Sequence, residues 1–527
     1  MSQRHFEPLS GGRARVDWGI TALMITVFFV GFFLLTHGNR FPSFYHPEEE
    51  IRAKRVIKKD WDLHGPLLFA ITTRVLKTGL HIPDDVQTVV QIGRTVSALF
   101  AVGSIVCLGL AVYLIRNRAA AVLLSFLLLC QHQFFDLAHT MSENTSLMFG
   151  SSLTLLAIVL LEQKASVARA LFLGVSVAIA ASAKYVGTLL FIPALITVLR
   201  RGGKEFRINR IVEFCLGLLF AVLVINFFAI TELARAAFDL AQDLVVAFGS
   251  TSGGLQSLVH GTYWLALWHN TTPVIWAMVG ISLWVLWIRR RKLMMSEILL
   301  VAIPLVYFLL LLFSPPESDL RFLPVIGFTY TLAVVGVASG AELLSTFGEQ
   351  VKGWLLPVLV GVCLAAGFVE FLRGYPYFSA FTWDQRVEML TWMDGNLPPG
   401  SKVVADPSVL LPNLLVETKK KYRFELLIDD RLMDPGDRSR YDRVVAAGID
   451  YAVVSASDYK PFFSTVSALD EVGQPSNSVQ QFYSELSKKG TLVWSRDRGA
   501  VPYLQPGLEI YHLPKSETRA AEAGIGD

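Results

Sequence analysis

The stretch "TVSALFAVGSIVCLGLAVYLI", Thr95–Ile115, is 21 residues long and contains no charged residue. An α-helix needs about 20 apolar residues to cross the hydrocarbon core of a bilayer, so this stretch is long enough to span a membrane. The rest of the chain has the same character. Of its 527 residues, 53% are hydrophobic and only 17% are charged, and the mean hydropathy is +0.47. The composition therefore predicts a membrane protein with several spans.

Eight further apolar runs predict further membrane helices. They are Trp18–His37, Ala119–Phe135, Thr145–Leu161, Ile211–Ile230, Thr272–Ile288, Ile298–Phe313, Phe322–Val337 and Trp354–Phe368. The segment Ala170–Leu199 is too long for one ordinary span, and "SAKYVG", Ser182–Gly187, interrupts it. We interpret this segment as a pair of short helices, which brings the total to about eleven spans.

The basic residues between the spans predict the orientation. They gather before the first span and in loops such as "RRGGKEFRINR", Arg200–Arg210, and "RRRK", Arg289–Lys292. Lys and Arg favour the cytoplasmic side. With the N-terminus inside and the break at Lys184 treated as an outside turn, all these clusters fall inside. The first long loop, 38–94, and the region after the last span then lie outside. No small-residue cleavage site follows the first span, so we expect it to stay as an anchor.

The hydropathy falls near Arg373, which divides the chain. We predict a helical membrane domain at 1–373, an extracytoplasmic α/β domain at 374–515 and a disordered tail at 516–527. The strand-like segments of the second domain are "SKVVAD", "FELLI", "DYAVVSA", "TLVWS" and "LEIYHL", and its helix-like segments are "TWDQRVEMLTWMDGN" and "SRYDRVVAAG". This domain has no glycine-rich phosphate loop, and its acidic residues are scattered, so we expect the chemistry elsewhere.

The first outside loop, 38–94, is too long and too charged to be a mere connector. It contains "PSFYHPEEEIRAKRV", Pro42–Val56, with three consecutive carboxylates at Glu48–Glu50. Loops of this length are usually functional or disordered. One interpretation of the carboxylates is a working site. The other is the acidic first turn of a helix beginning after Pro47, where carboxylates favour the positive end of the helix dipole.

Polar residues also stand at other predicted outside turns. The second loop, "FFDLAHTMSENTS", carries Asp136, His139 and Glu143. Charged residues at helix ends often extend to water without further function, and His139 has no spacing partner typical of a metal site. Lys184 is harder to explain in this way because it interrupts an apolar run. The last loop, "SPPESDLRFLP", places Arg321 directly before a span.

The order of these features resembles the GT-C superfamily of membrane glycosyltransferases that use polyprenyl-phosphate sugars. The branch in question contains the protein O-mannosyltransferases and the lipid A aminoarabinose transferases. In that branch an "hPDE"-like acidic pair is followed by a "PPL"-type segment, a second-loop acid, a "GLAxxxKxxG" helix break and an "R(Y/F)xxP" motif. Here these appear as "HPEE", "HGPLLF", "SENTSLMF", "GVSVAIAASAKYVG" and "RFLP". The resemblance covers Met1–Phe371 and implies the GT-C fold.

Two positions depart from the family pattern. Glu48 stands where the family has Asp, and Gly65-Pro66 stands where it has two prolines. The extra methylene of Glu48 shifts a catalytic carboxylate by about an ångström, a displacement large enough to affect the rate considerably. A divergent or inactive member is therefore an alternative.

The resemblance implies that the protein transfers a sugar from a polyprenyl-phosphate donor, with inversion if displacement is direct. Breaking the anomeric C–O bond places negative charge on the leaving phosphate, and the acceptor hydroxyl loses a proton. Glu48 is implied as the base, and Glu49 as a residue that orients or holds substrate. The residues Arg321, Lys184 and Tyr185 are implied at the donor phosphate.

A second acidic site is implied at Glu143, together with Asp136 and His139, where it would position the acceptor. No cofactor is required. If a divalent metal takes part, Glu48 and Glu143 are its candidate ligands. The implied partners are an undecaprenyl- or dolichyl-phosphate sugar, membrane lipids, and a lipid, glycan or protein acceptor. Nothing indicates nucleic acid.

Two readings from other classes compete with a transferase. A transporter or flippase of lipid-linked sugars would bind the same phosphate, but the sequence shows no internal repeat with paired broken helices. A non-catalytic assembly or sensor protein is the other reading. Essential charges on one outside surface favour a transferase, whereas a path of charges across the membrane favours a carrier.

The positions of the cysteines and the absence of a retention signal indicate in which membrane the protein lies. Cys107, Cys130, Cys215 and Cys363 all lie in predicted spans, so the exported segments have no disulfide framework. An exported domain without cysteines, and without a retention signal, favours a bacterial inner membrane with the active site on the periplasmic side. "NTS" at Asn144 and "NTT" at Asn270 would be glycosylation acceptors only in a eukaryotic secretory setting.

Overall fold

The computed structural model describes residues 17–39, 47–58, 67–201, 207–227, 267–268, 270–290, 293–311, 323–344, 349–381, 383–406, 409, 422–426, 440–456, 477–499, 501 and 504–514. The chain divides into two compact units. The membrane unit comprises Met1–His37 and Glu50–Tyr375, and the C-terminal unit comprises Gly38–Glu49 and Pro376–Asp527. Helix α18, Glu349–Ala380, runs through the boundary between them, and it continues past Gly374, where the hydropathy predicts a domain boundary.

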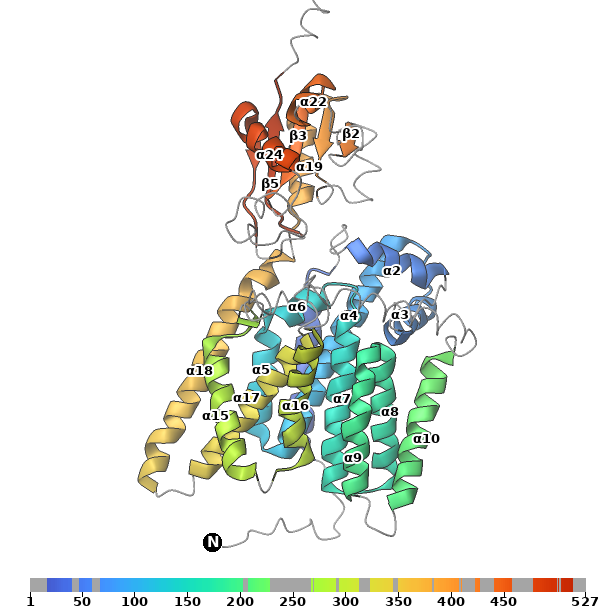
Figure 1. The fold of residues 1–527 in the computed structure, drawn as a ribbon, viewed down its shortest axis with the longest axis vertical. Helices are drawn as coiled ribbons and strands as arrows, with labels where there is room; N and C mark the ends of the chain where they lie inside the picture. Colours follow the sequence, from blue (N-terminus) through green and yellow to red (C-terminus); the bar gives the residue numbers. More distant parts are fainter. Residues whose placement is uncertain are drawn as a thin grey trace, which may run out of the picture. The chain divides into compact units, whose positions relative to one another are not determined.

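The membrane unit is built from helices (Figure 1). The described ones are α1 Trp18–Thr36, α2 Pro47–Lys58, α3 Leu67–Gly79, α4 Val86–Ile115, α5 Arg118–Cys130, α6 His132–Ala138, α7 Asn144–Gln163, α8 Val167–Ala183, the 3-10 helix η1 Tyr185–Leu190, α9 Phe191–Arg201, α10 Arg207–Ile225, α15 Pro273–Arg289, α16 Met295–Leu311, α17 Leu323–Leu344 and α18. Each of the nine predicted single spans coincides with a helix, or with the pair α5 and α6.

The length and apolar character of these helices fit an integral membrane protein. Five described helices are long and apolar enough to cross a bilayer, or six if the bent pair α5 and α6 is one span. Shorter apolar helices include α8, α15 and α16. The total of about eleven spans stays a prediction.

The predicted span Ala119–Phe135 is not one straight helix, which corrects the sequence interpretation. Helices α5 and α6 meet at an angle of 60°. The bend falls at Gln131, whose side-chain oxygen accepts a hydrogen bond from Gln133 N at 2.6 Å and so caps α6. Its amide nitrogen donates to Asn270 O at 2.9 Å. A polar side chain that caps a second helix thus ends the first one inside an apolar run.

The predicted break at Lys184 is confirmed. Helix α8 ends at Ala183, Lys184 is extended, and η1 begins at Tyr185. The turn is closed by a hydrogen bond of 2.7 Å from Gly187 N to Lys184 O. A Cβ atom at position 187 would lie 2.0 Å from Ala180 O, so this close return of the chain requires glycine.

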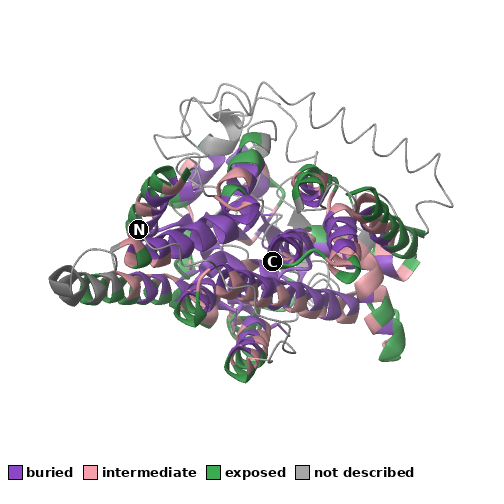
Figure 2. Cartoon of the chain, turned by 90° about the horizontal axis from the view of Figure 1, so that it is seen from below, coloured by how far each residue is buried: buried purple, intermediate pink, exposed green. Residues whose placement is uncertain are grey.

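Helices α7, α8 and α10 lie side by side in that order, and α8 with α10 forms a tight crossing (Figure 1). A Cβ on Gly174 of α8 would lie 2.1 Å from Phe214 O, and one on Gly217 of α10 would lie 2.2 Å from Leu171 O. Two glycines therefore let the backbones approach, as small residues commonly do in membrane helices. Buried residues gather where helices meet, and exposed residues lie on the outer faces (Figure 2).

A buried ion network joins the ends of several helices. Glu297, at the start of α16, is fully buried and pairs with Arg116 at the end of α4. Arg289, at the end of α15, donates to the same carboxylate at 3.0 Å. Next to it, Glu162 of α7 accepts from Met295 N at 2.6 Å and from Ser296 N. These carboxylates satisfy the first N–H groups of α16 and balance the arginines.

The C-terminal unit contains a five-stranded sheet of order β2-β1-β3-β5-β4. Its strands are β1 Lys402–Ala405, β2 Arg423–Leu426, β3 Tyr451–Ser455, β4 Thr491–Ser495 and β5 Leu508–His512. Strand β1 is parallel to β2 and β3, whereas β5 is antiparallel to β3 and β4. All five strand-like segments seen in the sequence are strands.

Helices cover both faces of this sheet. Phe482 and Leu486 of α24, Asn477–Lys489, pack with Val404 on one face, together with α22, Arg440–Ala446. Met389 and Met393 of α19, Gln385–Asn396, pack with Val403 on the other face. Neighbouring residues of β1 thus point to opposite faces, as the two-residue period of a strand requires. The sequence analysis did not predict α24, whose first turns are mostly polar.

Candidate functional site

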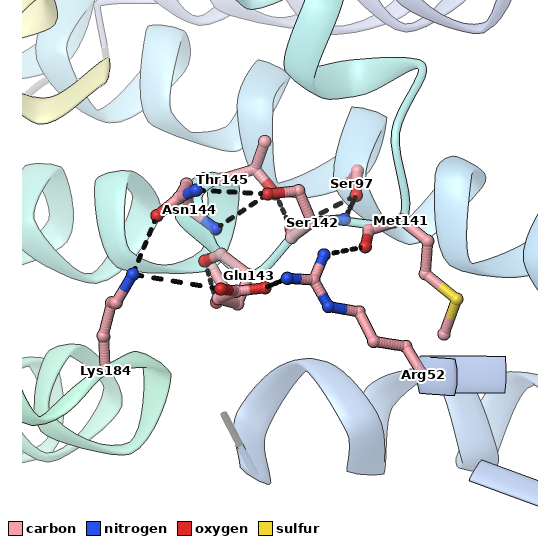
Figure 3. A network of polar contacts seen from close by, with 9 residues as sticks. Arg52, Ser97, Met141, Ser142, Glu143, Asn144, Thr145 and Lys184 are labelled. Carbon is pink, nitrogen blue, oxygen red and sulfur yellow. Dashed lines mark hydrogen bonds and ion pairs between the residues drawn. The ribbon is translucent and has the colours of Figure 1, made fainter. Parts of the chain in front are cut away.

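The carboxylate of Glu143 lies between two cations in the membrane unit (Figure 3). Arg52 Nη2 of α2 is 2.7 Å from one oxygen, and Lys184 Nζ is 3.8 Å from the other. The side chains of Arg52, Glu143 and Lys184 are 19%, 12% and 25% exposed. All three side chains therefore remain partly open to solvent.

Backbone and side-chain hydrogen bonds hold Glu143 in place (Figure 3). Ser142 N donates to Ser97 Oγ of α4 at 3.1 Å, and Arg52 Nη1 donates to Met141 O. Lys184 Nζ also donates to Asn144 Oδ1 at 3.2 Å. We call these residues, with Thr145, the Glu143 network. It draws on α2, α4, α7 and the break after α8, so a rigid scaffold positions the charges.

The network contains two of the residues predicted from the sequence, Glu143 and Lys184. It also contains Arg52 and Asn144, which the sequence analysis did not single out. No local pattern marks Arg52, because it is one of several basic residues that follow Glu48 on a charged helix. In the sequence, Asn144 begins "NTS" and lies within the motif segment "SENTSLMF".

The triple carboxylate forms the first turn of α2, which begins at Pro47. Glu49 is fully buried, whereas Glu48 is exposed. The interpretation as an acidic helix start is therefore confirmed for the position of these residues. Their roles as base and orienting residue stay predictions.

The remaining predicted residues are placed as follows. Tyr185 opens η1, and 45% of it is exposed. Asp136 is half-buried on α6. Arg321, predicted at the donor phosphate, lies outside the described residues.

His139 is fully buried just after α6. Its Nδ1 lies 2.6 Å from Phe135 O, and its Nε2 lies 2.5 Å from His37 O at the end of α1. Burial lowers the pKa of His139 to about 4, although both carbonyl oxygens favour the charged form. Both ring nitrogens thus face backbone, so His139 ties α6 to α1 and is unsuited to binding a metal.

Among the described residues, no cluster of three or more His, Cys, Asp and Glu side chains could hold a metal ion. The surroundings of Glu143 do not fit a divalent ion either, because its oxygens face Arg52 and Lys184.

Both asparagines of the glycosylation sequences are buried. Asn144 is 7% exposed and Asn270 is 3% exposed. The Asn144 amide contacts Lys184 and Ser142, and Asn270 Oδ1 lies 2.8 Å from His132 Nε2. Neither amide is accessible for modification in the folded protein.

The fold and the site together define a polytopic membrane protein with a charged site held by the ends of its helices. A family model described as dolichyl-phosphate-mannose-protein mannosyltransferase matches residues 75–230. This stretch includes α4 to α10 and therefore both Glu143 and Lys184. The match covers less than half of the chain and lies in the membrane half, where the sequence resembles membrane mannosyltransferases. No curated protein sequence matches the chain.

Several solved structures are similar to the chain at low identity. ArnT from Cupriavidus metallidurans bound to undecaprenyl phosphate is 13% identical, with a TM-score of 0.49, over 94% of this chain and 98% of that one. The archaeal oligosaccharyltransferase AglB from Archaeoglobus fulgidus is 10% identical, with a TM-score of 0.46, over 92% and 80%. The arabinofuranosyltransferase AftD from mycobacteria is 15% identical, with a TM-score of 0.43, over 94% and 42%.

Proposed function

We propose that this protein is a glycosyltransferase that moves a sugar from a polyprenyl-phosphate donor to a lipid, glycan or protein acceptor. The observation that carries the proposal is the position of Glu143 between Arg52 and Lys184. It is supported by the family match, whose description names a dolichyl-phosphate-linked sugar donor.

The charge of the Glu143 network suits a phosphate. Two cations, Arg52 and Lys184, face the carboxylate of Glu143. Arg52 offers a planar fork that matches phosphate oxygens, and Lys184 offers a compact point charge. A donor phosphate bound here would share these cations with Glu143. The negative charge on the phosphate would increase as the glycosidic bond breaks, and the cations would stabilise it.

The apolar surface beside Lys184 suits a lipid tail. Leu189 of η1 is 37% exposed, and Ile192 and Ile196 of α9 are 58% and 39% exposed. These side chains follow Lys184 within a dozen residues, on the segment that begins at the break. Burial of apolar surface there would contribute to donor binding.

In the proposed reaction the acceptor oxygen attacks the anomeric carbon, and the bond from that carbon to the phosphate oxygen breaks. The phosphate leaves with the electron pair and is met by Lys184 and Arg52. The acceptor proton passes to a carboxylate, for which we propose Glu48, with Glu49 orienting substrate. Both precede Arg52 on α2 by about one helical turn. A direct displacement inverts the anomeric configuration. We further propose a bacterial inner membrane location, with the site on the periplasmic side.

The proposal is tested by transfer from radiolabelled undecaprenyl-phosphate sugars to endogenous acceptors in membranes that contain the protein. Lys184→Ala and Glu48→Gln should each lower transfer at least about 100-fold, the range of a lost catalytic group. Arg52→Ala should lower it as well, and Arg52→Lys should restore only part because it lacks the fork.

Lys164→Ala is the matched control. Lys164 is an exposed lysine at the opposite end of α7, so its loss should leave transfer unchanged. Wild-type protein that moves intact donor across proteoliposomes, and transfers no sugar, would favour the flippase instead. Normal transfer by Glu48→Gln would remove Glu48 as the base.

A further inference from the structure

Asn144, the first residue of α7, holds the ammonium group of Lys184 (Figure 3). Lys184 Nζ donates a hydrogen bond to Asn144 Oδ1 at 3.2 Å, whereas Glu143 Oε1 lies 3.8 Å from Nζ, beyond hydrogen-bond distance. Of these two neighbours, the neutral amide therefore makes the hydrogen bond, and the carboxylate interacts with the lysine through its charge.

The chemistry of the two groups fixes the orientation of the Asn144 amide. A lysine ammonium only donates hydrogen bonds, so the atom that faces it must be the amide oxygen. The amide nitrogen then faces Ser142 Oγ and donates to it at 3.3 Å, and Asn144 N donates to the same oxygen at 3.3 Å. Only 7% of Asn144 is exposed, so both ends of the amide are held inside the protein.

Ser142 is in turn fixed to α4. Ser142 N donates to Ser97 Oγ at 3.1 Å, and that hydroxyl donates to Ser142 O at 3.3 Å. The hydroxyl of Thr145 donates to the same carbonyl oxygen at 3.0 Å. Both serines are buried. A continuous chain of hydrogen bonds thus leads from α4 through Ser142 and Asn144 to Lys184.

Lys184 needs such a partner because its side chain is long. The hydrogen bond from Gly187 N to Lys184 O fixes its backbone. The four-carbon stem beyond the backbone is flexible, and 25% of the side chain is exposed. A carboxylate at hydrogen-bond distance would hold the ammonium group but would also compensate its charge. The amide of Asn144 holds the ammonium group and adds no charge.

We infer that Asn144 is a positioning residue, which fixes the direction of the Lys184 ammonium group and leaves its charge for an anionic ligand. The identity of that ligand, a polyprenyl phosphate, rests on the proposed function. Asn144 acts through Lys184 and takes no part in the bond changes. Loss of the amide oxygen therefore matters only while the lysine is present.

A double-mutant cycle with Lys184 tests this role. The measurement is the Kd of the purified protein in detergent for undecaprenyl phosphate, which carries no sugar. Asn144→Ala should raise this Kd about 10-fold, which corresponds to the loss of one hydrogen bond to a charged group. In Lys184→Met, which keeps the apolar stem, the same substitution should change the Kd by less than about 2-fold. An equal effect in both backgrounds would overturn the inference.

Asn226→Ala is the matched control. Asn226 Nδ2 donates to Ser182 Oγ at 2.7 Å, so this amide holds the same break two residues before Lys184. Its effect on the Kd should be equal in the wild-type and Lys184→Met backgrounds. A dependence on Lys184 as large as that of Asn144→Ala would mean that any loosening of the break disturbs the lysine. That result would overturn a specific role for Asn144.

Asn144→Asp keeps the inference testable if Asn144→Ala folds poorly, because aspartate preserves the shape of the side chain and an acceptor oxygen. Its added charge should bind the ammonium group more tightly and raise the Kd at least about 10-fold. An unchanged Kd would overturn the inference.

Failure of the proposed function gives a different result. Wild-type protein that binds undecaprenyl phosphate and shows the coupling between Asn144 and Lys184, yet transfers no sugar, would remove the transferase and leave the role of Asn144 intact. Sugar transfer by wild type without that coupling would overturn only the role of Asn144. Wild-type protein that does not bind undecaprenyl phosphate would overturn both.

Discussion

Asp17 shows at the scale of a single residue how neighbours fix a charge. Its carboxylate caps α1 by accepting from Gly19 N at 3.1 Å, and it receives Tyr113 Oη at 2.7 Å and Arg118 Nε at 3.0 Å. These hydrogen bonds, that of Arg118 first, lower the pKa of Asp17 to about 2 from 3.8. The carboxylate joins the start of α1 to the facing ends of α4 and α5.

Asp17→Asn should therefore destabilise the protein in a pH-dependent way. Asparagine still caps a helix, so the change removes the charge alone. A depressed pKa contributes stability that is present above 3.8 and is lost as the pH falls through about 2. The Tm gap between wild type and variant should be widest near about pH 7 and should shrink below about pH 4. A gap that stays constant with pH would contradict the assigned ion pair.

The candidate site was predictable for residues whose charge conflicts with their surroundings. Lys184 stands out because it interrupts an apolar run, and Glu143 because it begins a span. Arg52 does not stand out, since it is one of several basic residues on a charged helix. Only the packing of α2 selects Arg52 from that set, and packing between distant segments is not encoded in a local pattern.

At the scale of an element, the crossing of α8 and α10 depends on two glycines. Gly174→Ala or Gly217→Ala would push a methyl group against a backbone oxygen about 2 Å away. We expect each to cost about 1–3 kcal/mol of stability, as overpacking typically does, measured by unfolding in detergent.

Gly280→Ala in α15 is the control for this prediction. A Cβ there meets nothing within 4 Å. Alanine in a helix interior is roughly 0.5–1 kcal/mol better than glycine, so this variant should be neutral or slightly stabilised. Equal destabilisation at all three positions would mean that the crossing is not the cause.

The two broken helices differ in how far the sequence revealed them. The break at Lys184 was predicted because a charged residue marks it. The bend at Gln131 was missed, because a neutral amide hardly changes the hydropathy of the run. Its cause is the capping bond to Gln133 N and the contact with Asn270. Neither a short-range cap nor a partner 139 residues away alters a hydropathy average.

At the scale of the whole molecule, Glu297 links helices that are far apart in the sequence. Glu297→Ala would leave the arginine of α4 buried, with its side chain 5% exposed and without its partner. Breaking a buried pair in this way costs about 3–5 kcal/mol. Arg289→Ala should cost far less, about 0–1 kcal/mol, because its side chain is 32% exposed. The free energy of unfolding in detergent should be measured for both variants. An equal decrease for Glu297→Ala and Arg289→Ala would contradict this prediction.

The overall class followed from hydropathy, because bilayer thickness forces long apolar helices that a simple average detects. The division into units did not follow in the same way. Hydropathy changes near Arg373, yet α18 is helical to Ala380 and the structure groups Gly38–Glu49 with the C-terminal unit. The grouping of Gly38–Glu49 with the C-terminal unit depends on contacts between segments hundreds of residues apart, which composition does not record.

The buried asparagines have a consequence for producing this protein in a eukaryotic host. Sugar can be attached to Asn144 only while the chain is still unfolded, since the finished fold encloses its amide against Lys184 and Ser142. A glycan at that position would therefore label molecules that never completed insertion. On a gel, the fraction of protein whose mobility changes after endoglycosidase treatment would then measure the misassembled fraction. A well-folded preparation should contain no protein of this kind.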